Sequence, residues 1–180
     1  MSEQIIKVID KEFEIFIPNS EIDSAIQKVA NQINKDYEHK KPLFVVILNG
    51  AFMFAADLMK KLTIECEVSF VKLSSYQGMR TTEKVKKIIG LNESIAGRSI
   101  IIVEDIIDTG ITMEHLLEEL GALNPRDIKI STLLYKPDAF RKDYKIDYIG
   151  LDIPNDFILG YGLDYDGFAR NLPDIYKLIK

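Results

Sequence analysis

The strongest constraint on the fold comes from two runs rich in isoleucine, valine and leucine. They are Leu43–Leu48 and Ser99–Glu104, and neither contains a glycine or a proline. Continuous apolar runs of this length are typical of strands buried on both faces, as in parallel sheets. Each run leads to a glycine, Gly50 or Gly110, and then to a helical pattern. This strand–turn–helix order predicts an α/β fold, a doubly wound parallel sheet with helices on both faces.

The rest of the chain extends this alternation and then departs from it. Ile128–Tyr135 and Asp147–Leu151 read as two further strands, and Glu65–Leu73 alternates polar and apolar residues like a half-exposed strand. The polar stretch Ser74–Thr82 predicts a mobile loop. After Pro154 the pattern weakens into aromatic residues, glycines and aspartates, which indicates a smaller subregion.

A helix is expected near the start of the chain. Apolar residues at helical spacing run from Ile22 to Ile33. Ser20 and Asp23 have the spacing of a capping box, so we expect them to begin this helix.

Composition and charge limit the class of protein and of partner. The 180 residues fit one domain, expected over 1–180, and no run approaches the roughly 18 apolar residues that cross a bilayer. The formal net charge of −5 gives no support for general nucleic-acid binding. One cysteine, Cys66, excludes an intramolecular disulfide framework, and Met1–Lys11 lacks the apolar stretch of a signal peptide. We therefore expect a cytoplasmic protein with no membrane and no nucleic-acid partner.

The segment with the chemistry of a binding site is Val103–Thr112, VEDIIDTGIT. In open parallel sheets, ligands bind beyond the carboxyl ends of the strands. This segment ends at the start of a predicted helix, where unpaired N–H groups and the helix dipole favour an anion. Asp108–Thr112 supplies a glycine-containing turn with two hydroxyls, which is enough to bind a phosphate monoester.

Two carboxylates precede this turn. Glu104 and Asp105 have the wrong sign for phosphate, but they can accept hydrogen bonds from sugar hydroxyls or contact a magnesium ion. The loop is not a P-loop, because the Gly-Lys-Ser/Thr ending is absent, and no GxGxxG follows a strand. The residues alone therefore predict a phosphosugar or nucleotide site, with helix capping in a solvated loop as the plainer interpretation.

VEDIIDTGITM resembles the phosphoribosyl diphosphate motif of the purine phosphoribosyltransferases, specifically of their hypoxanthine-guanine branch. Four further segments support this resemblance in the family's order and spacing. They are LNGAFMFAADL at Leu48–Leu58, SSY at Ser74–Tyr76, LLYKPDAF at Leu133–Phe140, and IPNDFILGYGLDYDGFARNL at Ile153–Leu172.

This resemblance implies a type I phosphoribosyltransferase fold, with a parallel core sheet at about 20–150. A small hood would come from the N-terminal region and about 153–180. It implies an enzyme of purine salvage that transfers the 5-phosphoribosyl group from phosphoribosyl diphosphate to hypoxanthine, guanine or both. The products would be IMP or GMP and diphosphate. The resemblance also implies Mg²⁺ as cofactor and a homodimer or homotetramer.

The resemblance assigns roles to the acidic motif and to the turn after it. Glu104 and Asp105 would hold the ribose hydroxyls, and whether they also contact the metal stays open. The 5′-phosphate would be bound by Asp108, Thr109, Gly110, Ile111 and Thr112. Asp108 would also act as general base, or would stabilise the protonated purine.

The purine, the metal and the diphosphate have their own candidate residues in this resemblance. Lys136 would donate to a 6-oxo group and reject adenine, Phe157 would stack on the purine, and backbone groups of Ile158 would read its edge. Asp164 would meet magnesium, commonly through water, and Arg170 would reach the diphosphate.

Two loops complete the implied site. Leu48, Asn49 and Gly50 would receive the diphosphate through backbone N–H groups, and the family often has a cis peptide between the first two. Many relatives have a basic residue where this chain has Asn49, so the backbone would contribute more here. Ser75 and Tyr76 resemble the start of a lid that excludes water during transfer.

Two other functions stay open at this point. A regulator with the same fold would bind RNA, but the net charge and the retained Asp108, Lys136 and Phe157 weigh against it. A different transferase of this fold would act on xanthine, a pyrimidine or another nitrogen nucleophile.

Overall fold

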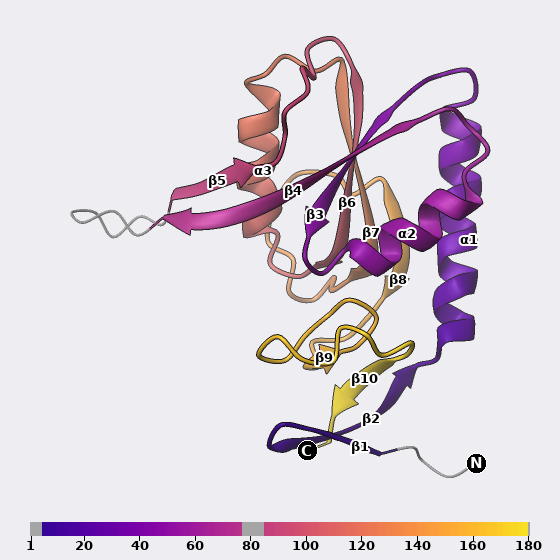
Figure 1. Cartoon of the computed structure of the whole chain (residues 1–180), viewed down its shortest axis with the longest axis vertical. Helices are drawn as coiled ribbons and strands as arrows, with labels where there is room; N and C mark the ends of the chain where they lie inside the picture. The colour runs from indigo at the N-terminus through magenta and orange to yellow at the C-terminus, as the bar shows by residue number, and fades with distance from the viewer. Residues whose placement is uncertain (1–4, 77–84, 180) are drawn as a thin grey trace.

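A computed structural model describes residues 5–76 and 85–179 and contains a six-stranded sheet (Figure 1). The strand order is β5-β4-β3-β6-β7-β8. These strands are β3 (Leu43–Leu48), β4 (Glu67–Tyr76), β5 (Val85–Ile89), β6 (Ser99–Ile107), β7 (Asp127–Tyr135) and β8 (Tyr148–Asp152). All neighbours pair in parallel except β4 and β5, which are antiparallel. The predicted parallel sheet is confirmed, and its order reverses between β3 and β6, where doubly wound folds bind their ligands.

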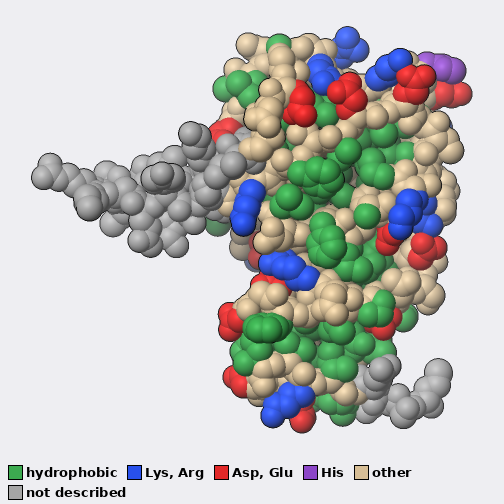
Figure 2. Space-filling view, in the orientation of Figure 1, with side chains coloured by type: hydrophobic (Ala, Val, Ile, Leu, Met, Phe, Trp, Pro, Cys, Tyr) green, Lys and Arg blue, Asp and Glu red, His purple; other side chains and the backbone are tan. Residues whose placement is uncertain are grey.

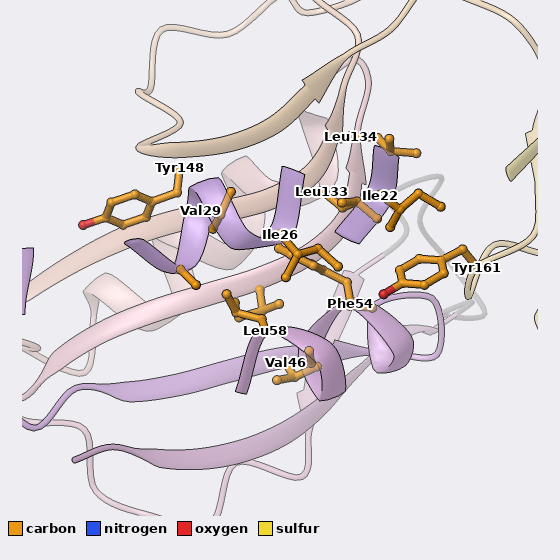
Figure 3. Packing of buried hydrophobic residues seen from close by; sticks show 14 of the residues in the cluster. Ile22, Ile26, Val29, Val46, Phe54, Leu58, Leu133, Leu134, Tyr148 and Tyr161 are labelled. Carbon is orange, nitrogen blue, oxygen red and sulfur yellow. The ribbon is translucent and has the colours of Figure 1, made fainter. Parts of the chain in front are cut away.

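Helices cover both faces of this sheet, as the alternating pattern predicts. Helices α1 (Asn19–Asp36) and α2 (Phe52–Lys61) pack on one face, and α3 (Ile111–Gly121) packs on the other. Figure 3 shows the first of these cores, in which Phe54 and Leu58 of α2 lie beside Val46 of β3. Among the described residues, no helix is long and apolar enough to span a membrane.

A second, smaller sheet forms the hood. Its order is β1-β2-β10-β9, all antiparallel, from β1 (Ile6–Val8), β2 (Lys11–Ile17), β9 (Ile158–Leu159) and β10 (Ile175–Leu178). The hood has its own core of Phe13, Leu159 and Tyr176. It lies beyond the carboxyl ends of the main strands (Figure 1). The hood thus combines strands from near the start of the chain, β1 and β2, with β9 and β10 from near its end, and it covers the carboxyl edge of the main sheet.

Strands β4 and β6 both extend beyond their predicted ends at Leu73 and Glu104. Residues 74–76 of the predicted loop Ser74–Thr82 belong instead to β4, which continues to Tyr76 through antiparallel pairing with β5. Residues 77–84 lie outside the described part of the chain. Strand β6 also continues beyond Glu104 to Ile107, because its last residues pair with β7.

Candidate active site

The loop from β6 to α3 surrounds a small cavity at the reversal point of the sheet. Asp108 and Thr109 are exposed, and Gly110 precedes α3 with a φ of +82°. The cavity has a volume of about 210 Å³ and is lined by Glu104, Ile106, Ile107, Asp108, Gly110, Thr112 and Met113. Four residues that we predict to bind the sugar or its phosphate, Glu104, Asp108, Gly110 and Thr112, thus line one cavity.

The start of α3, directly after this loop, has features of an anion-binding site. Ile111 is the first residue of α3, and its side chain is 50% exposed. The residue before α3 is Gly110, which has no side chain that could cap the helix, so the backbone at this end is open to an anion. We call Asp108–Thr112 the phosphate loop from here on.

The side chain of Asp105, near the end of β6, lies against the loop that follows β3. Its Oδ1 accepts the N–H of Ile106 at 2.8 Å. Its Oδ2 lies so close to Gly50 that a Cβ there would be only 1.6 Å away. Gly50 is therefore required by close packing, and it places the carboxylate of Asp105 directly beside the Leu48–Gly50 loop.

The Leu48–Gly50 loop has the backbone that the resemblance implies. The peptide bond between Leu48 and Asn49 is cis, which confirms that expectation, and Asn49 is exposed. The hood contacts this loop through Gly162, where a Cβ would lie 2.1 Å from the carbonyl oxygen of Gly50. Ser75 and Tyr76 end the parallel neighbour β4, so their backbone lies at the same edge of the sheet.

The residues predicted to bind the purine lie where the hood meets β7. Lys136 follows β7, and its Nζ donates to the carbonyl oxygen of Asp156 at 2.8 Å. The ring of Phe157 is 46% exposed and lies 6.2 Å from Phe13 and 5.7 Å from Tyr165, centroid to centroid. The next residue, Ile158, is buried at the start of β9.

One residue of this hood region was missed by the sequence reasoning. The Nζ of Lys11 lies 5.8 Å from the centroid of Phe157. No motif marks Lys11, because it meets Phe157 only through the pairing of distant strands in the hood.

The two remaining candidates contact each other. Arg170 Nη2 lies 2.6 Å from Asp164 Oδ1, and Arg170 Nη1 donates to the carbonyl oxygen of Gly162 at 2.7 Å. The other oxygen of Asp164 accepts the N–H of Gly167 at 2.7 Å. These contacts place Arg170, which is predicted to reach the diphosphate, beside Gly162, the glycine that contacts the Leu48–Gly50 loop.

The carboxylates of this site suit a magnesium ion that is also bound by water and by substrate phosphates. Within residues 5–76 and 85–179, no group of three or more His, Cys, Asp or Glu is arranged to hold a metal ion. Magnesium usually takes one or two protein carboxylates and completes its shell with water and substrate phosphates. Glu104 and Asp105 lie near the carboxyl end of β6, and Asp164 is linked through Arg170 and Gly162 to the Leu48–Gly50 loop. All three are carboxylates and so match that chemistry in type.

Comparisons with known proteins agree with this geometry. The family model for the phosphoribosyl transferase domain matches residues 18–166. A hypoxanthine phosphoribosyltransferase of Salmonella typhimurium is 40% identical over 169 residues, which cover 92% of this chain and 95% of the relative. A hypoxanthine-guanine phosphoribosyltransferase of Mycobacterium bovis is 36% identical over 171 residues, which cover 91% of this chain and 85% of the relative.

A solved structure shows the same fold. The crystal structure of a hypoxanthine-guanine phosphoribosyltransferase from Bacillus anthracis matches with a TM-score of 0.84 at 33% identity. The match covers 92% of this chain and 98% of that one. The chain therefore belongs to the phosphoribosyltransferase family, within its hypoxanthine(-guanine) branch.

Proposed function

We propose that this protein transfers the 5-phosphoribosyl group of phosphoribosyl diphosphate to hypoxanthine or guanine, giving IMP or GMP and diphosphate. The observation that carries the proposal is the cavity at the reversal point of the sheet. This cavity is lined both by Glu104 and by the glycine turn at the start of α3. A sugar phosphate carries both hydroxyls, which a carboxylate can bind, and a phosphate, which a helix start can bind. The named relatives are hypoxanthine and hypoxanthine-guanine phosphoribosyltransferases.

The sugar phosphate is bound from two directions in this proposal. N–H groups of the phosphate loop and the hydroxyls of Thr109 and Thr112 donate to the 5′-phosphate, aided by the dipole of α3. Glu104 and Asp105 accept hydrogen bonds from the ribose hydroxyls. The diphosphate group lies at the Leu48–Gly50 loop, with Arg170 as its cationic partner.

The transfer itself is a substitution at the anomeric carbon of the ribose. A ring nitrogen of the purine forms the new bond while the bond from that carbon to the diphosphate oxygen breaks. The carboxylate of Asp108 takes the proton that the purine loses, or stabilises the protonated ring until the proton leaves. Orientation of the two substrates and fixed dipoles supply most of the rate enhancement.

The purine is selected at the hood in this proposal. Phe157 offers a half-exposed ring for stacking, and Ile158 offers backbone groups to the edge of the base. Lys136 donates to a 6-oxo group, and it would meet another donor in the amino group of adenine. Adenine is therefore expected to be a poor substrate.

Magnesium is the cofactor in this proposal. Asp164 would hold it, commonly through water, with Glu104 and Asp105 as further candidate ligands. When bound, the ion offsets the negative charge of the diphosphate in an acidic site. Cys66 is free and no disulfide is needed for the fold, so we keep the cytoplasm as the proposed location.

A panel of bases tests the proposed function. Purified protein with magnesium and phosphoribosyl diphosphate is offered hypoxanthine, guanine, xanthine, adenine or uracil, and the nucleotide product is identified by mass. We expect product with hypoxanthine or guanine, at least about 10²-fold less with adenine because Lys136 would oppose its amino group, and none with uracil. A product with uracil or adenine alone would refute the assignment. RNA binding without any product would favour the regulatory alternative.

We also infer that the protein is a homodimer or homotetramer. Val68 and Phe70 of β4 are 42% and 48% exposed, on the face whose β3 neighbours Phe44 and Val46 are buried under helices. Figure 2 shows apolar side chains gathered on this face over β4 and α2. An open apolar face of this kind is typical of an interface, and we assign it to a second copy of the chain.

Light scattering tests this assembly. The wild-type protein is expected to have the mass of a dimer or tetramer, and Phe70→Glu is expected to halve that mass, because it buries a charge in the contact. Phe168→Glu is the matched control, since Phe168 is 64% exposed on the hood. A monomeric wild-type protein would contradict the inference, as would an effect of Phe168→Glu alone.

A further inference from the structure

The segment after β7 packs directly against the phosphate loop. The hydroxyl of Tyr144 donates to the carbonyl oxygen of Gly110 at 2.8 Å. The N–H of Arg141 donates to the carbonyl oxygen of Thr109 at 3.4 Å. Lys142 forms an ion pair with Glu114 in the first turn of α3 at 2.6 Å. One short segment thus contacts the loop and the helix start at three points.

Gly110 is the closest point of this contact. A Cβ at Gly110 would lie 2.6 Å from the hydroxyl oxygen of Tyr144 and 2.7 Å from the ring of Phe140. The rings of Phe140 and Tyr144 meet edge to face, with centroids 5.2 Å apart. Phe140 and Tyr144 therefore pack against each other and against Gly110, the residue with positive φ that precedes α3.

The hydrogen bond from Tyr144 fixes a peptide group of the proposed phosphate site. The oxygen of Gly110 accepts both the Tyr144 hydroxyl and the N–H of Glu114, the latter at 3.0 Å. A trans peptide group is planar, so its C=O and its N–H point in opposite directions. Holding the oxygen of Gly110 therefore sets the direction of the Ile111 N–H, which has no partner within the helix.

Tyr144 is suited to act as a permanent donor. Burial, reinforced by the nearby Glu114 carboxylate, raises the pKa of the Tyr144 hydroxyl well above its ordinary value. The hydroxyl is therefore protonated and able to donate at neutral pH.

We infer that Tyr144 is a positioning residue for the sugar 5′-phosphate, because its hydroxyl orients the Ile111 N–H through Gly110 before the ligand binds. This inference rests on the proposed function, since it assigns the phosphate loop to that phosphate. It adds a residue that lies 34 positions beyond Gly110 and outside the motif of the loop.

Tyr144→Phe tests the inference, because it removes the hydroxyl and keeps the ring on Phe140. Tyr148→Phe is the matched control. The Tyr148 hydroxyl also makes one part-buried hydrogen bond, to Asp36 at 2.9 Å. Its ring packs against Val29 of α1, in the core on the other face of the sheet from α3 (Figure 3). Calorimetry with magnesium measures the binding of ribose 5-phosphate and, separately, of diphosphate.

We expect Tyr144→Phe to weaken ribose 5-phosphate binding about fivefold, the loss typical of one hydrogen bond. The KM for phosphoribosyl diphosphate should rise by a similar factor, with kcat and diphosphate binding unchanged. Tyr148→Phe should change none of these.

Equal weakening of both ligands by Tyr144→Phe would mean that the hydroxyl supports only the fold, which overturns the inference. So would an effect no larger than that of Tyr148→Phe. If the wild-type protein binds neither ligand, the proposed function fails together with the inference. If the wild-type protein binds both and only the Tyr144 effect is missing, the inference alone fails.

Discussion

Asp108→Asn is expected to lower kcat by about 10²-fold, the lower end of the range for loss of a general acid–base group. Asparagine has the shape of aspartate, and its carbonyl oxygen can still accept the N–H of Thr109, as Asp108 does in this structure. The phosphate loop should therefore keep its conformation. The KM for phosphoribosyl diphosphate should change little, because only the proton acceptor is lost.

The control for this variant is Asp152→Asn. Asp152 is an exposed carboxylate at the end of β8, on the same edge of the sheet but two strands from β6. Steady-state rates at saturating magnesium and base give kcat for both variants. A kcat for Asp108→Asn that matches the wild type and Asp152→Asn would contradict the role of Asp108.

Gly162→Ala is expected to destabilise the protein by about 3 kcal/mol, through positive-φ strain and overpacking together. The added Cβ would lie 2.1 Å from the carbonyl oxygen of Gly50, and φ at Gly162 is +97°. Backbone cannot rotate away as a side chain can, so the hood must move from the Leu48–Gly50 loop. A shift of about 1 Å in a substrate-binding element can reduce kcat/KM roughly 10²-fold.

Gly167→Ala separates the two causes. Gly167 also has a positive φ, +86°, but nothing lies within 4 Å of the position of its Cβ. It should cost about 1 kcal/mol from backbone strain alone and leave kcat/KM close to the wild-type value. Denaturant unfolding and steady-state rates measure both effects. Equal losses in the two variants would show that the contact between Gly162 and Gly50 does not position the hood.

Local patterns in the sequence account for the main sheet and for the phosphate loop. The apolar runs of β3 and β6 are buried as predicted, and the glycine turn that starts α3 lines a cavity with Glu104. Both features depend on residues close together in the chain. Periodicity and turn chemistry report such features directly.

The start of α1 shows where local patterns fail. The expected capping box of Ser20 and Asp23 is not formed, because α1 begins at Asn19, before Ser20. The N–H of Asn19 is accepted instead by Asp174 at 2.7 Å, 155 residues away. A cap supplied by tertiary contact leaves no mark in the sequence around the helix.

Contacts between distant glycines and side chains are invisible in the sequence for the same reason. The approach of Gly162 to Gly50, and the hydrogen bond from Tyr144 to Gly110, each join segments that only the folded sheet and hood bring together. The ion pair of Asp164 with Arg170 is a local contact, but it too was not expected, because the resemblance assigns each residue to a different ligand.

The most direct test of the proposed transfer is the ratio of its two products. Protein, magnesium, phosphoribosyl diphosphate and hypoxanthine are incubated, and the amounts of IMP and diphosphate are measured in the same samples. The transfer predicts one IMP for each diphosphate, with neither formed when a chelator removes magnesium or when hypoxanthine is omitted. Diphosphate released without IMP would mean hydrolysis rather than transfer, and the absence of both products would contradict the proposed function.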